Sequence, residues 1–359
     1  MQQEIYRTTC NKEKRRNMIT QTIHSEEVSR ANALIRKAQS VAILTHMSPD
    51  GDAMGSSLAM KLYLQALGKE TIAVIVPNSF PDFLAWLPDA GNILVYDKQE
   101  EESKTIIANT DLIICLDFND TKRIGKMGEA VEQSAAKKIV LDHHLFPQDF
   151  ANITMSYPHA SSTSELVFRF ICQSGDFGLL NTSIATCIYT GIMTDTGNFS
   201  YSSNNPELYQ IAAELMKQNI DKDAIYDQVF NTYSVSRMRL TGYCLYRKMR
   251  ILGKNTALIA LSKDELLRFN FQSGDGEGLV NLPLQIANVH YSVFMREDKD
   301  KIKISFRSQG ERPVNEFAAK YFNGGGHKNA AGGESYDSLE DTVKRFEQHF
   351  REYFKKEQQ

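Results

Sequence analysis

Short apolar runs alternate with stretches of helical periodicity through the first 200 residues of the chain. The runs are rich in β-branched residues and short enough to be buried parallel strands; they cover 41–44, 71–76, 111–116 and 137–141. Apolar residues at helical spacing cover 26–38, 58–67 and 184–193, and hydroxyl residues at 161–164 before an apolar stripe predict another helix start. Strands that alternate with helices predict an α/β fold with a doubly wound, mostly parallel sheet.

The pattern changes after the short stretch 199–201, which we expect to be extended. Pro206 opens a polar helical region that we interpret as a linker over 206–240. Beyond it, strand-like and helical runs interleave and predict a smaller α/β domain with a mixed sheet; they cover 256–261, 264–269, 289–295, 301–306, 314–322 and 339–355. The expected organisation is a disordered tail over 1–24, a first domain over 25–205, the linker, and a second domain over 241–357.

Composition is that of an ordinary globular protein, since 42% of the 359 residues are hydrophobic and 24% are charged. No apolar stretch approaches the ~20 residues of a membrane span. The polar first 17 residues lack the apolar core of a signal peptide, and Met18 is an alternative start. Five scattered cysteines without a CxxC pair favour a reducing compartment, by default the cytoplasm. A net charge of -3 argues against a grip on long duplex nucleic acid, which needs a cationic surplus.

Candidate chemistry lies in the loops that follow the predicted strands. The first loop carries His46, Asp50 and Asp52, with glycines that relieve crowding of its backbone. Asp-Gly turns and Asp at a helix start are also common structural features, so this loop alone leaves a purely structural interpretation open.

More such residues follow the later strands and end the 184–193 helix: Asp117, Asp142, His143, His144 and Asp195. Carboxylates gathered at one edge of a sheet repel one another unless cations lie between them. Imidazole and carboxylate ligands without thiolates suit Mn²⁺ and tolerate Mg²⁺, Co²⁺ or iron. So many ligands favour two metal ions, which together suit hydrolysis of a phosphoester.

The order HxxxDxD, a lone Asp, DHH and DTG resembles the DHH phosphoesterase superfamily. The sequence GGGHKNAAGG at 324–333 resembles the glycine-rich signature of its DHH-associated C-terminal domain. Length and spacing most resemble the NrnA-type nanoRNases, which degrade very short oligonucleotides and dephosphorylate 3′-phosphoadenosine 5′-phosphate (pAp). The resemblance also suggests a homodimer.

The resemblance implies a role for each candidate residue. His46 and Asp50 would bind one metal ion, and Asp117 would bridge the two. The second ion would be held by Asp52, His143 and Asp195. His144 would face the scissile phosphate as an electrostatic stabiliser or proton donor, and Asp142 would orient an imidazole.

The glycine-rich stretch and the strand at 301–306 are candidates for substrate binding. Backbone without Cβ atoms can approach a phosphate or a base closely. Arg307, followed by Ser308, can grip a terminal phosphate, and His327 can stack on a base. A tight turn and a solvated arginine are the structural alternative. Arg123 is a further candidate beside the metals, whereas 161–164 reads as a helix cap. The glycines in question are Gly324, Gly325, Gly326, Gly332 and Gly333.

We therefore expect a manganese-dependent hydrolase that degrades oligonucleotides of a few residues to mononucleotides and removes the 3′-phosphate of pAp. One alternative is a phosphodiesterase for cyclic or linear dinucleotides. A second, from a different class, is a non-catalytic nucleotide sensor that retains the fold. The expected residue types fill every ligand position of the family, which favours an enzyme.

Overall fold

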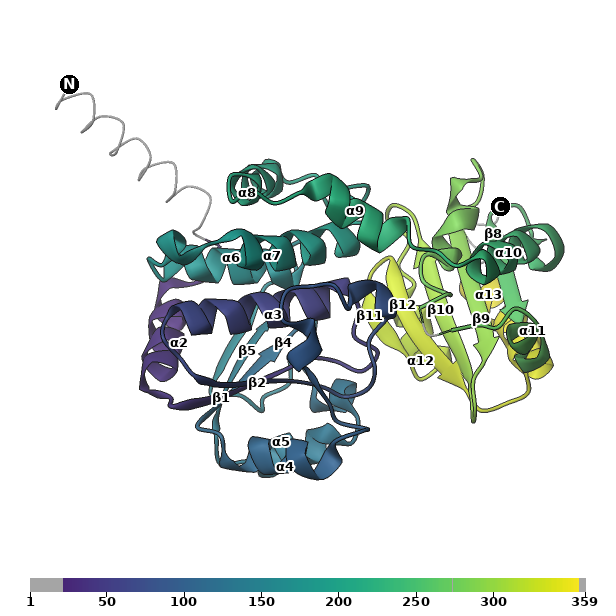
Figure 1. The fold of residues 1–359 in the computed structure, drawn as a ribbon. Coiled ribbons are helices and arrows are strands. Elements are labelled where there is room, and N and C mark those ends of the chain that lie inside the picture. Colours follow the sequence, from purple (N-terminus) through teal and green to yellow (C-terminus); the bar gives the residue numbers. More distant parts are fainter. Residues whose placement is uncertain (1–21, 273, 355–359) are drawn as a thin grey trace, which may run out of the picture. The chain divides into compact units, whose positions relative to one another are not determined.

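The computed structural model describes residues 22–272 and 274–354, which belong to two compact units that meet in the chain between Thr232 and Tyr233 (Figure 1). The first unit is built on a parallel sheet of order β3-β2-β1-β4-β5-β6. Its strands are β1 (Ser40–Leu44), β2 (Thr71–Val76), β3 (Leu94–Val95), β4 (Leu112–Leu116), β5 (Lys137–Asp142) and β6 (Ile153–Ser156). Strand order therefore reverses between β1 and β4, the point at which doubly wound sheets bind ligands.

Helices cover both faces of this sheet, with α3, α6 and α7 on one face and α4 and α5 on the other (Figure 1). The side chains of strand β1 alternate between the two faces. Val41 and Ile43 belong to the core under α3, while Ala42 and Leu44 belong to the core under α4 and α5. Burial on both faces explains the continuous apolar strands of the sequence. The helices are α2 (Ser25–Lys37), α3 (Gly51–Ala66), α4 (Glu100–Asn109), α5 (Met127–Gln133), α6 (Thr163–Gln173) and α7 (Thr182–Asp195).

Three helices follow in the region interpreted as a linker: α8 (Pro206–Met216), α9 (Lys222–Phe230) and α10 (Val235–Tyr243). Leu208 and Ile211 of α8 and Ile225 of α9 are buried in the core of the first unit. Leu240 of α10 is buried in a core of the second unit. Short helical turns complete the elements: Asp82–Leu84, Ala90–Asn92, Thr121–Ile124, Phe177–Leu179, Leu279–Gln285 and the π-helix Cys244–Lys248.

The second unit has a mixed sheet of order β11-β12-β10-β9-β8-β7, in which β8 and β9 are parallel and the other neighbours antiparallel. Phe306 and Val293 face an aromatic core that also contains Phe317 and Phe346, whereas Phe294 faces a second core. The elements are β7 (Arg250–Leu252), β8 (Thr256–Leu261), α11 (Lys263–Arg268), β9 (Tyr291–Glu297), β10 (Ile302–Ser308), α12 (Asn315–Tyr321), β11 (Gly325–His327), β12 (Ala330–Ser335) and α13 (Leu339–Tyr353).

The predicted fold class is confirmed, and the differences are local. The stretch 199–201 is not extended, because the backbone N–H groups of Ser200 and Tyr201 return to the carbonyl oxygen of Thr196 and close a turn after α7. Most of the tail expected over 1–24 lies outside the described residues, and so does Met18, but Ile23 is buried in the first core. Across 22–272 and 274–354, the helices are all too short or too polar to cross a membrane.

Candidate metal centre and substrate residues

The candidate ligands follow neighbouring strands of the first sheet. Strands β1 and β4 are adjacent and parallel, and so are β4 and β5. Their carboxyl ends therefore meet at one edge, where His46 comes two residues after β1, Asp117 directly after β4, and His143 directly after β5. Asp195 is the last residue of α7.

Asp117 lies at the centre of the group. Its Oδ2 is 3.2 Å from Nε2 of His46, and its Oδ1 is 3.5 Å from Nε2 of His143. The hydroxyl of Thr163 donates to Oδ1 at 3.0 Å. The residue is 2% exposed, and its φ of 65° is left-handed, a conformation that Asp tolerates better than most residues. The two carboxylate oxygens of Asp117 thus face different histidines.

Two sets of potential ligands share this carboxylate. Within each set the ligand atoms lie within 4.8 Å of one another: His46, Asp50 and Asp117 form one set, and Asp52, Asp117 and His143 form the other. Oδ2 of Asp195 lies 3.5 Å from Nε2 of His143, at the edge of the second set. The structure therefore brings together all six residues that the sequence singled out as metal ligands.

Asp50 caps α3 and also faces His46. Its Oδ1 accepts hydrogen bonds from the backbone N–H groups of Asp52 and Ala53 at 3.0 and 3.1 Å, which caps α3. Its Oδ2 lies 3.9 Å from Nε2 of His46. The helix cap therefore leaves one oxygen of Asp50 directed toward the candidate metal centre.

Asp52 is held by the start of α6. The backbone N–H groups of Thr163 and Ser164 donate to its two oxygens at 2.6 and 2.8 Å. Ser162 caps α6 by accepting from the N–H of Glu165, as the hydroxyl run predicts. The contact to Asp52 could not be found from the sequence, because only the packing of α6 against α3 decides which carboxylate meets those N–H groups.

The charges of this group depend on one another. Burial raises the pKa of Asp52, and the nearby carboxylates of Asp117 and Asp195 raise it further. Burial disfavours the charged form of His143, but its hydrogen bond to Asp117 and the surrounding carboxylates outweigh this and hold its pKa well above the usual value. Burial likewise opposes ionisation of Asp117, yet the hydrogen bonds from His143 and His46 hold its pKa well below the usual range.

This donor set fits divalent cations. Buried carboxylates and imidazoles without a thiolate suit Mn²⁺ and similar ions better than a structural zinc site. Two sets with a shared carboxylate suit a pair of ions.

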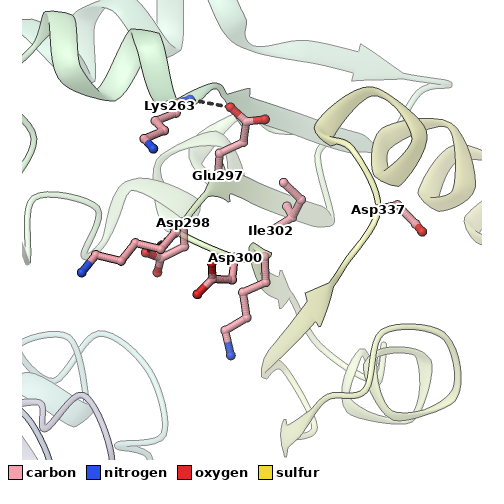
Figure 2. A pocket seen from close by; sticks show the side chains of 8 residues that line it. Lys263, Glu297, Asp298, Asp300, Ile302 and Asp337 are labelled. Atoms are coloured by element: carbon pink, nitrogen blue, oxygen red, sulfur yellow. Dashed lines mark hydrogen bonds between the residues drawn. The ribbon is translucent and has the colours of Figure 1, made fainter.

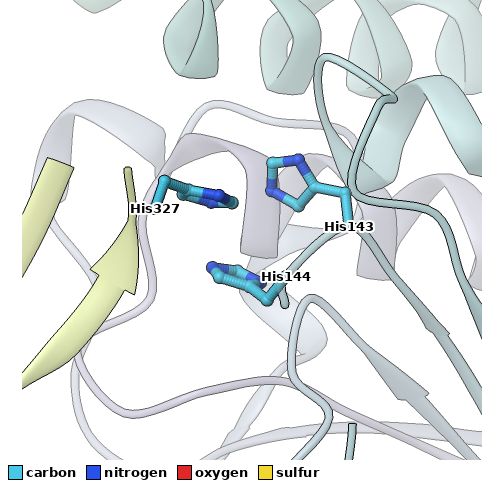
Figure 3. A group of neighbouring side chains, drawn as sticks. All are labelled: His143, His144 and His327. Carbon is cyan, nitrogen blue, oxygen red and sulfur yellow. The ribbon is translucent and has the colours of Figure 1, made fainter. Parts of the chain in front are cut away.

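His144 is oriented by Asp142. Oδ1 of Asp142 lies 2.7 Å from Nδ1 of His144, and Oδ2 accepts the backbone N–H of His144 at 2.9 Å. The rings of His143 and His144 stand edge to face, with centroids 4.8 Å apart (Figure 3). Burial lowers the pKa of His144 below its usual value despite Asp142, and the charge of Arg123 lowers it further.

Arg123 lies in the turn Thr121–Ile124, and its carbonyl oxygen accepts the N–H of Met47 at 2.7 Å. This hydrogen bond ties the turn to the loop that carries His46. The charge of Arg123 also counts among the influences that lower the pKa of His46, although the net shift of that pKa is upward. The structure therefore ties the backbone of Arg123 to the loop of His46, and the charge of Arg123 acts on the pKa values of His46 and His144.

In the second unit, the glycine-rich stretch forms the hairpin β11–β12 rather than a loop. A Cβ atom on Gly324 would lie 2.0 Å from the carbonyl oxygen of Gly332, and one on Gly326 would lie 2.5 Å from that of Ala330. A Cβ on Gly333 would meet Phe322 at 3.0 Å. Close packing within the hairpin and against Phe322 therefore requires these three glycines.

Gly325 and Gly332 differ, because both are exposed and pair with each other across the hairpin. Nothing lies within 4 Å of a Cβ on Gly325, and the nearest atom to one on Gly332 is 3.9 Å away. Packing therefore does not account for these two glycines, and their backbone is open to solvent.

Arg307 and Ser308 end β10, beside this hairpin. Arg307 pairs in register with Ala330, and its Nη1 donates to the carbonyl oxygen of Phe306 at 2.9 Å. The hydroxyl of Ser308 accepts from Nδ2 of Asn329 at 2.9 Å and is therefore engaged in holding the β10–β11 region. His327, half-buried, is the last residue of β11.

A hollow of about 230 Å³ lies elsewhere in the second unit, near the turn between β9 and β10 (Figure 2). Oε2 of Glu297 accepts the N–H of Lys263 there at 2.6 Å. Lysines and carboxylates are mixed around it, and it contains none of the predicted substrate residues; its lining is Lys263, Glu297, Asp298, Lys299, Asp300, Lys301, Ile302 and Asp337.

Comparisons with known proteins match this arrangement. Residues 40–192 match the DHH family, N-terminal domain, and residues 256–356 match the DHHA1 domain. The chain is 32% identical to a bifunctional oligoribonuclease and PAP phosphatase, NrnA, of Thermus thermophilus, over 81% of this chain and 83% of that protein. It is 26% identical to the Bacillus subtilis protein of the same name, over 81% and 88%. A crystal structure of an exopolyphosphatase-related protein from Bacteroides fragilis is 50% identical, with a TM-score of 0.88 over 93% of this chain and 98% of that one.

Proposed function

Because the chain belongs to the DHH family of phosphoesterases, we propose that it is a metal-dependent hydrolase that degrades very short oligonucleotides to mononucleotides and removes the 3′-phosphate of pAp. The observation that carries the proposal is the pair of ligand sets that share Asp117. A nucleotide sensor has no need of two such sets beside an oriented histidine.

His46, Asp50 and Asp117 would hold one divalent ion, and Asp52, Asp117, His143 and Asp195 would hold the other. Mn²⁺ is the ion that we propose, since it accepts both imidazole and carboxylate ligands. A bound pair of such ions supplies Lewis acidity to phosphate oxygens and lowers the pKa of water. The remaining chemistry belongs to side chains of this protein.

His144 is the residue that we propose for proton transfer. Its hydrogen bond to Asp142 fixes the ring and stabilises the imidazolium form when it arises. Its lowered pKa makes that imidazolium a stronger acid than an ordinary histidine, which suits donation of a proton to the departing ester oxygen. Asp142, fully buried, acts by positioning this ring.

Substrate binding is assigned to the second unit. The guanidinium of Arg307 can grip a terminal phosphate with two parallel hydrogen bonds. The bare backbone at Gly325 and Gly332 leaves room for a phosphate or a sugar, and His327 offers an aromatic face to a base. A few contacts of this kind suit a substrate with one or two phosphates, in keeping with the net charge of -3.

The test is hydrolysis by the purified protein in Mn²⁺ of pAp, a 5′-phosphorylated RNA dinucleotide, a 24-nucleotide single strand and a cyclic dinucleotide. We expect turnover of pAp and the dinucleotide to exceed turnover of the long strand. Asp117→Asn serves as the control, because it removes the carboxylate common to both ligand sets. Activity that rises with chain length, or that is confined to the cyclic compound, contradicts the proposal.

A further inference from the structure

A buried cluster of charged residues lies inside the first unit, away from the candidate ligands. Arg169 of α6 is 1% exposed, and its Nε donates to Oε1 of Glu165 at 2.7 Å. Its Nη2 donates to Oε2 of Glu207, at the start of α8, at 2.8 Å. Glu165 is itself 2% exposed. The guanidinium therefore connects α6 to the start of α8 through carboxylates.

Glu165 extends this cluster to the segment before α6. Its Oε2 accepts both the backbone N–H and the hydroxyl of Ser161, at 2.8 and 2.7 Å. With Oε1 held by Arg169, both oxygens of Glu165 have fixed partners. The position of Ser161 thus depends on a carboxylate whose own position depends on Arg169.

The segment 160–164 contacts three of the six candidate ligands. The N–H groups of Thr163 and Ser164 hold both oxygens of Asp52, and the Thr163 hydroxyl donates to Asp117. The carbonyl oxygen of Ala160 lies 3.3 Å from Nδ1 of His143. These contacts involve the Asp52, Asp117 and His143 set. In the other set the segment touches only the shared Asp117.

Stability alone does not explain a buried cluster of this kind. Removing charged groups from water costs free energy, and apolar residues of similar volume often replace a buried ion pair without loss of stability. The ion pair with Arg169 instead fixes the orientation of the Glu165 carboxylate. Only a carboxylate with a fixed orientation can accept from the N–H and the hydroxyl of Ser161 at once. Partners of this kind behind metal ligands are known to affect metal affinity strongly.

We propose that Arg169 is a positioning residue: through Glu165 it fixes the segment 160–164, and thereby sets Asp52, Asp117 and His143 for one metal ion of the pair. This inference rests on the metal centre put forward in the proposed function. It predicts an asymmetric effect, in which the ion held by Asp52 and His143 depends on Arg169 and the ion held by His46 and Asp50 does not.

The test is Mn²⁺ titration of the double variant Arg169→Met/Glu165→Gln, followed by the electron paramagnetic resonance signal of unbound Mn²⁺. This variant removes both charges of the pair and roughly keeps the volume. We expect one of two sites to weaken by about 10- to 100-fold and the other to keep its affinity. Turnover of pAp should fall while KM changes little. Arg169→Lys, which keeps the charge but not the fork that reaches two carboxylates, should give an intermediate loss.

Lys61→Met/Asp89→Asn is the matched control. It removes another ion pair of the same unit, in which Nζ of the buried Lys61 lies 2.5 Å from Oδ2 of the half-buried Asp89, and neither residue belongs to the segment 160–164. Both Mn²⁺ sites should remain. Equal weakening of Mn²⁺ binding in this control, or wild-type binding and turnover in Arg169→Met/Glu165→Gln, overturns the inference.

Two further measurements keep the outcomes distinct. Thermal unfolding of the metal-free variant shows whether it folds. If it does not, Glu207→Gln replaces it, since this change weakens the ion pair between Arg169 and the partly exposed Glu207 and leaves Glu165 in place. Glu207→Gln should weaken the same single Mn²⁺ site by a few-fold; no weakening overturns the inference. Failure of the proposed function would instead appear in the wild-type protein, as bound Mn²⁺ without hydrolysis of any nucleotide tested.

Discussion

Replacement of Gly191 by Ala is expected to damage the metal centre through steric pressure alone. Gly191 lies in α7, and a Cβ atom there would be 1.9 Å from Oγ of Ser164 and 2.9 Å from Oδ1 of Asp52. These two residues are joined by the hydrogen bond from the N–H of Ser164 to Oδ1 of Asp52, at 2.8 Å. A methyl group therefore enters directly beside this bond, and Ser164 must shift, which we expect to displace the Asp52 carboxylate that its N–H holds.

The size of the effect follows from the crowding. Extra methyl groups in a packed interior cost about 1–3 kcal/mol. For a unit of roughly 200 residues this lowers the Tm of the metal-free protein by about 2–4 °C for each kcal/mol. Displacement of Asp52 should weaken one Mn²⁺ site by about 10- to 100-fold, as loss of ligand orientation does elsewhere. Calorimetric titration with Mn²⁺ and thermal unfolding measure the two quantities.

Gly55→Ala is the control that separates displacement of the Asp52 carboxylate from a general loss of folding stability. Its Cβ would lie 2.5 Å from the carbonyl oxygen of Cys187 and 2.9 Å from the nitrogen of Gly191, so it crowds the same pair of helices without touching Asp52. We expect a similar loss of Tm and a smaller loss of Mn²⁺ affinity. If Gly191→Ala binds two Mn²⁺ ions as tightly as Gly55→Ala, the position of Asp52 does not control the metal centre and the reasoning is wrong.

His144→Ala should bind Mn²⁺ normally but lose about 10²- to 10⁴-fold in kcat for pAp, measured by phosphate release, because it removes the proposed proton donor; near-normal turnover refutes that role. Arg307→Ala should raise KM for a 5′-phosphorylated dinucleotide about tenfold or more while Arg307→Lys restores part of the affinity, and an unchanged KM removes Arg307 from substrate binding. Mn²⁺ should bind more tightly as pH rises and release protons, because Asp52 and His143, whose pKa values are raised, hold their protons to higher pH than usual and a cation displaces them; calorimetry in buffers of different ionisation enthalpy counts the protons. Asp52 and His143 have higher pKa values in the folded protein than in the unfolded chain. Their protonation therefore stabilises the metal-free fold at low pH, and the Tm of the metal-free protein should fall as pH rises through the folded-state pKa values. Bound Mn²⁺ should offset this fall.

The central strands were the most predictable part of the fold, whereas the short strands β3, β6 and β7 were not anticipated. Residues 71–76 and 256–261 coincide with β2 and β8, because β-branched and apolar side chains buried in the middle of a sheet leave a continuous pattern. The start of α3 was less predictable. Its first turns carry Asp52, Ser56 and Ser57, all buried, so the apolar periodicity begins only at Leu58. Local pattern fails here because polar side chains are buried in these turns, and one of them, Asp52, belongs to the candidate metal centre.

The site was predictable as a set of residues but not as a network. Parallel strands end at the same edge, which is enough to gather the residues that follow β1, β4 and β5. Nothing in the sequence indicates that Glu165 holds Ser161, or that Thr163 and Ser164 hold Asp52, because these contacts depend on how α6 packs. The hairpin at 325–335 was also missed, since runs of glycine have low strand propensity. Here β12 pairs with β10, and β11 pairs with β12.

The conformation of Asp117 ties the protonation of the candidate metal centre to its geometry. A left-handed residue directly after β4, nearly without solvent, places one carboxylate between His46 and His143. Those histidines keep Asp117 ionised, and its charge then raises the pKa of Asp52 nearby. Asp52 therefore holds its proton to higher pH than an ordinary aspartate, and a bound cation would displace that proton and satisfy a buried charge. Metal affinity, the pH dependence of folding and the packing at Gly191 should consequently change together whenever the geometry around Asp52 is altered.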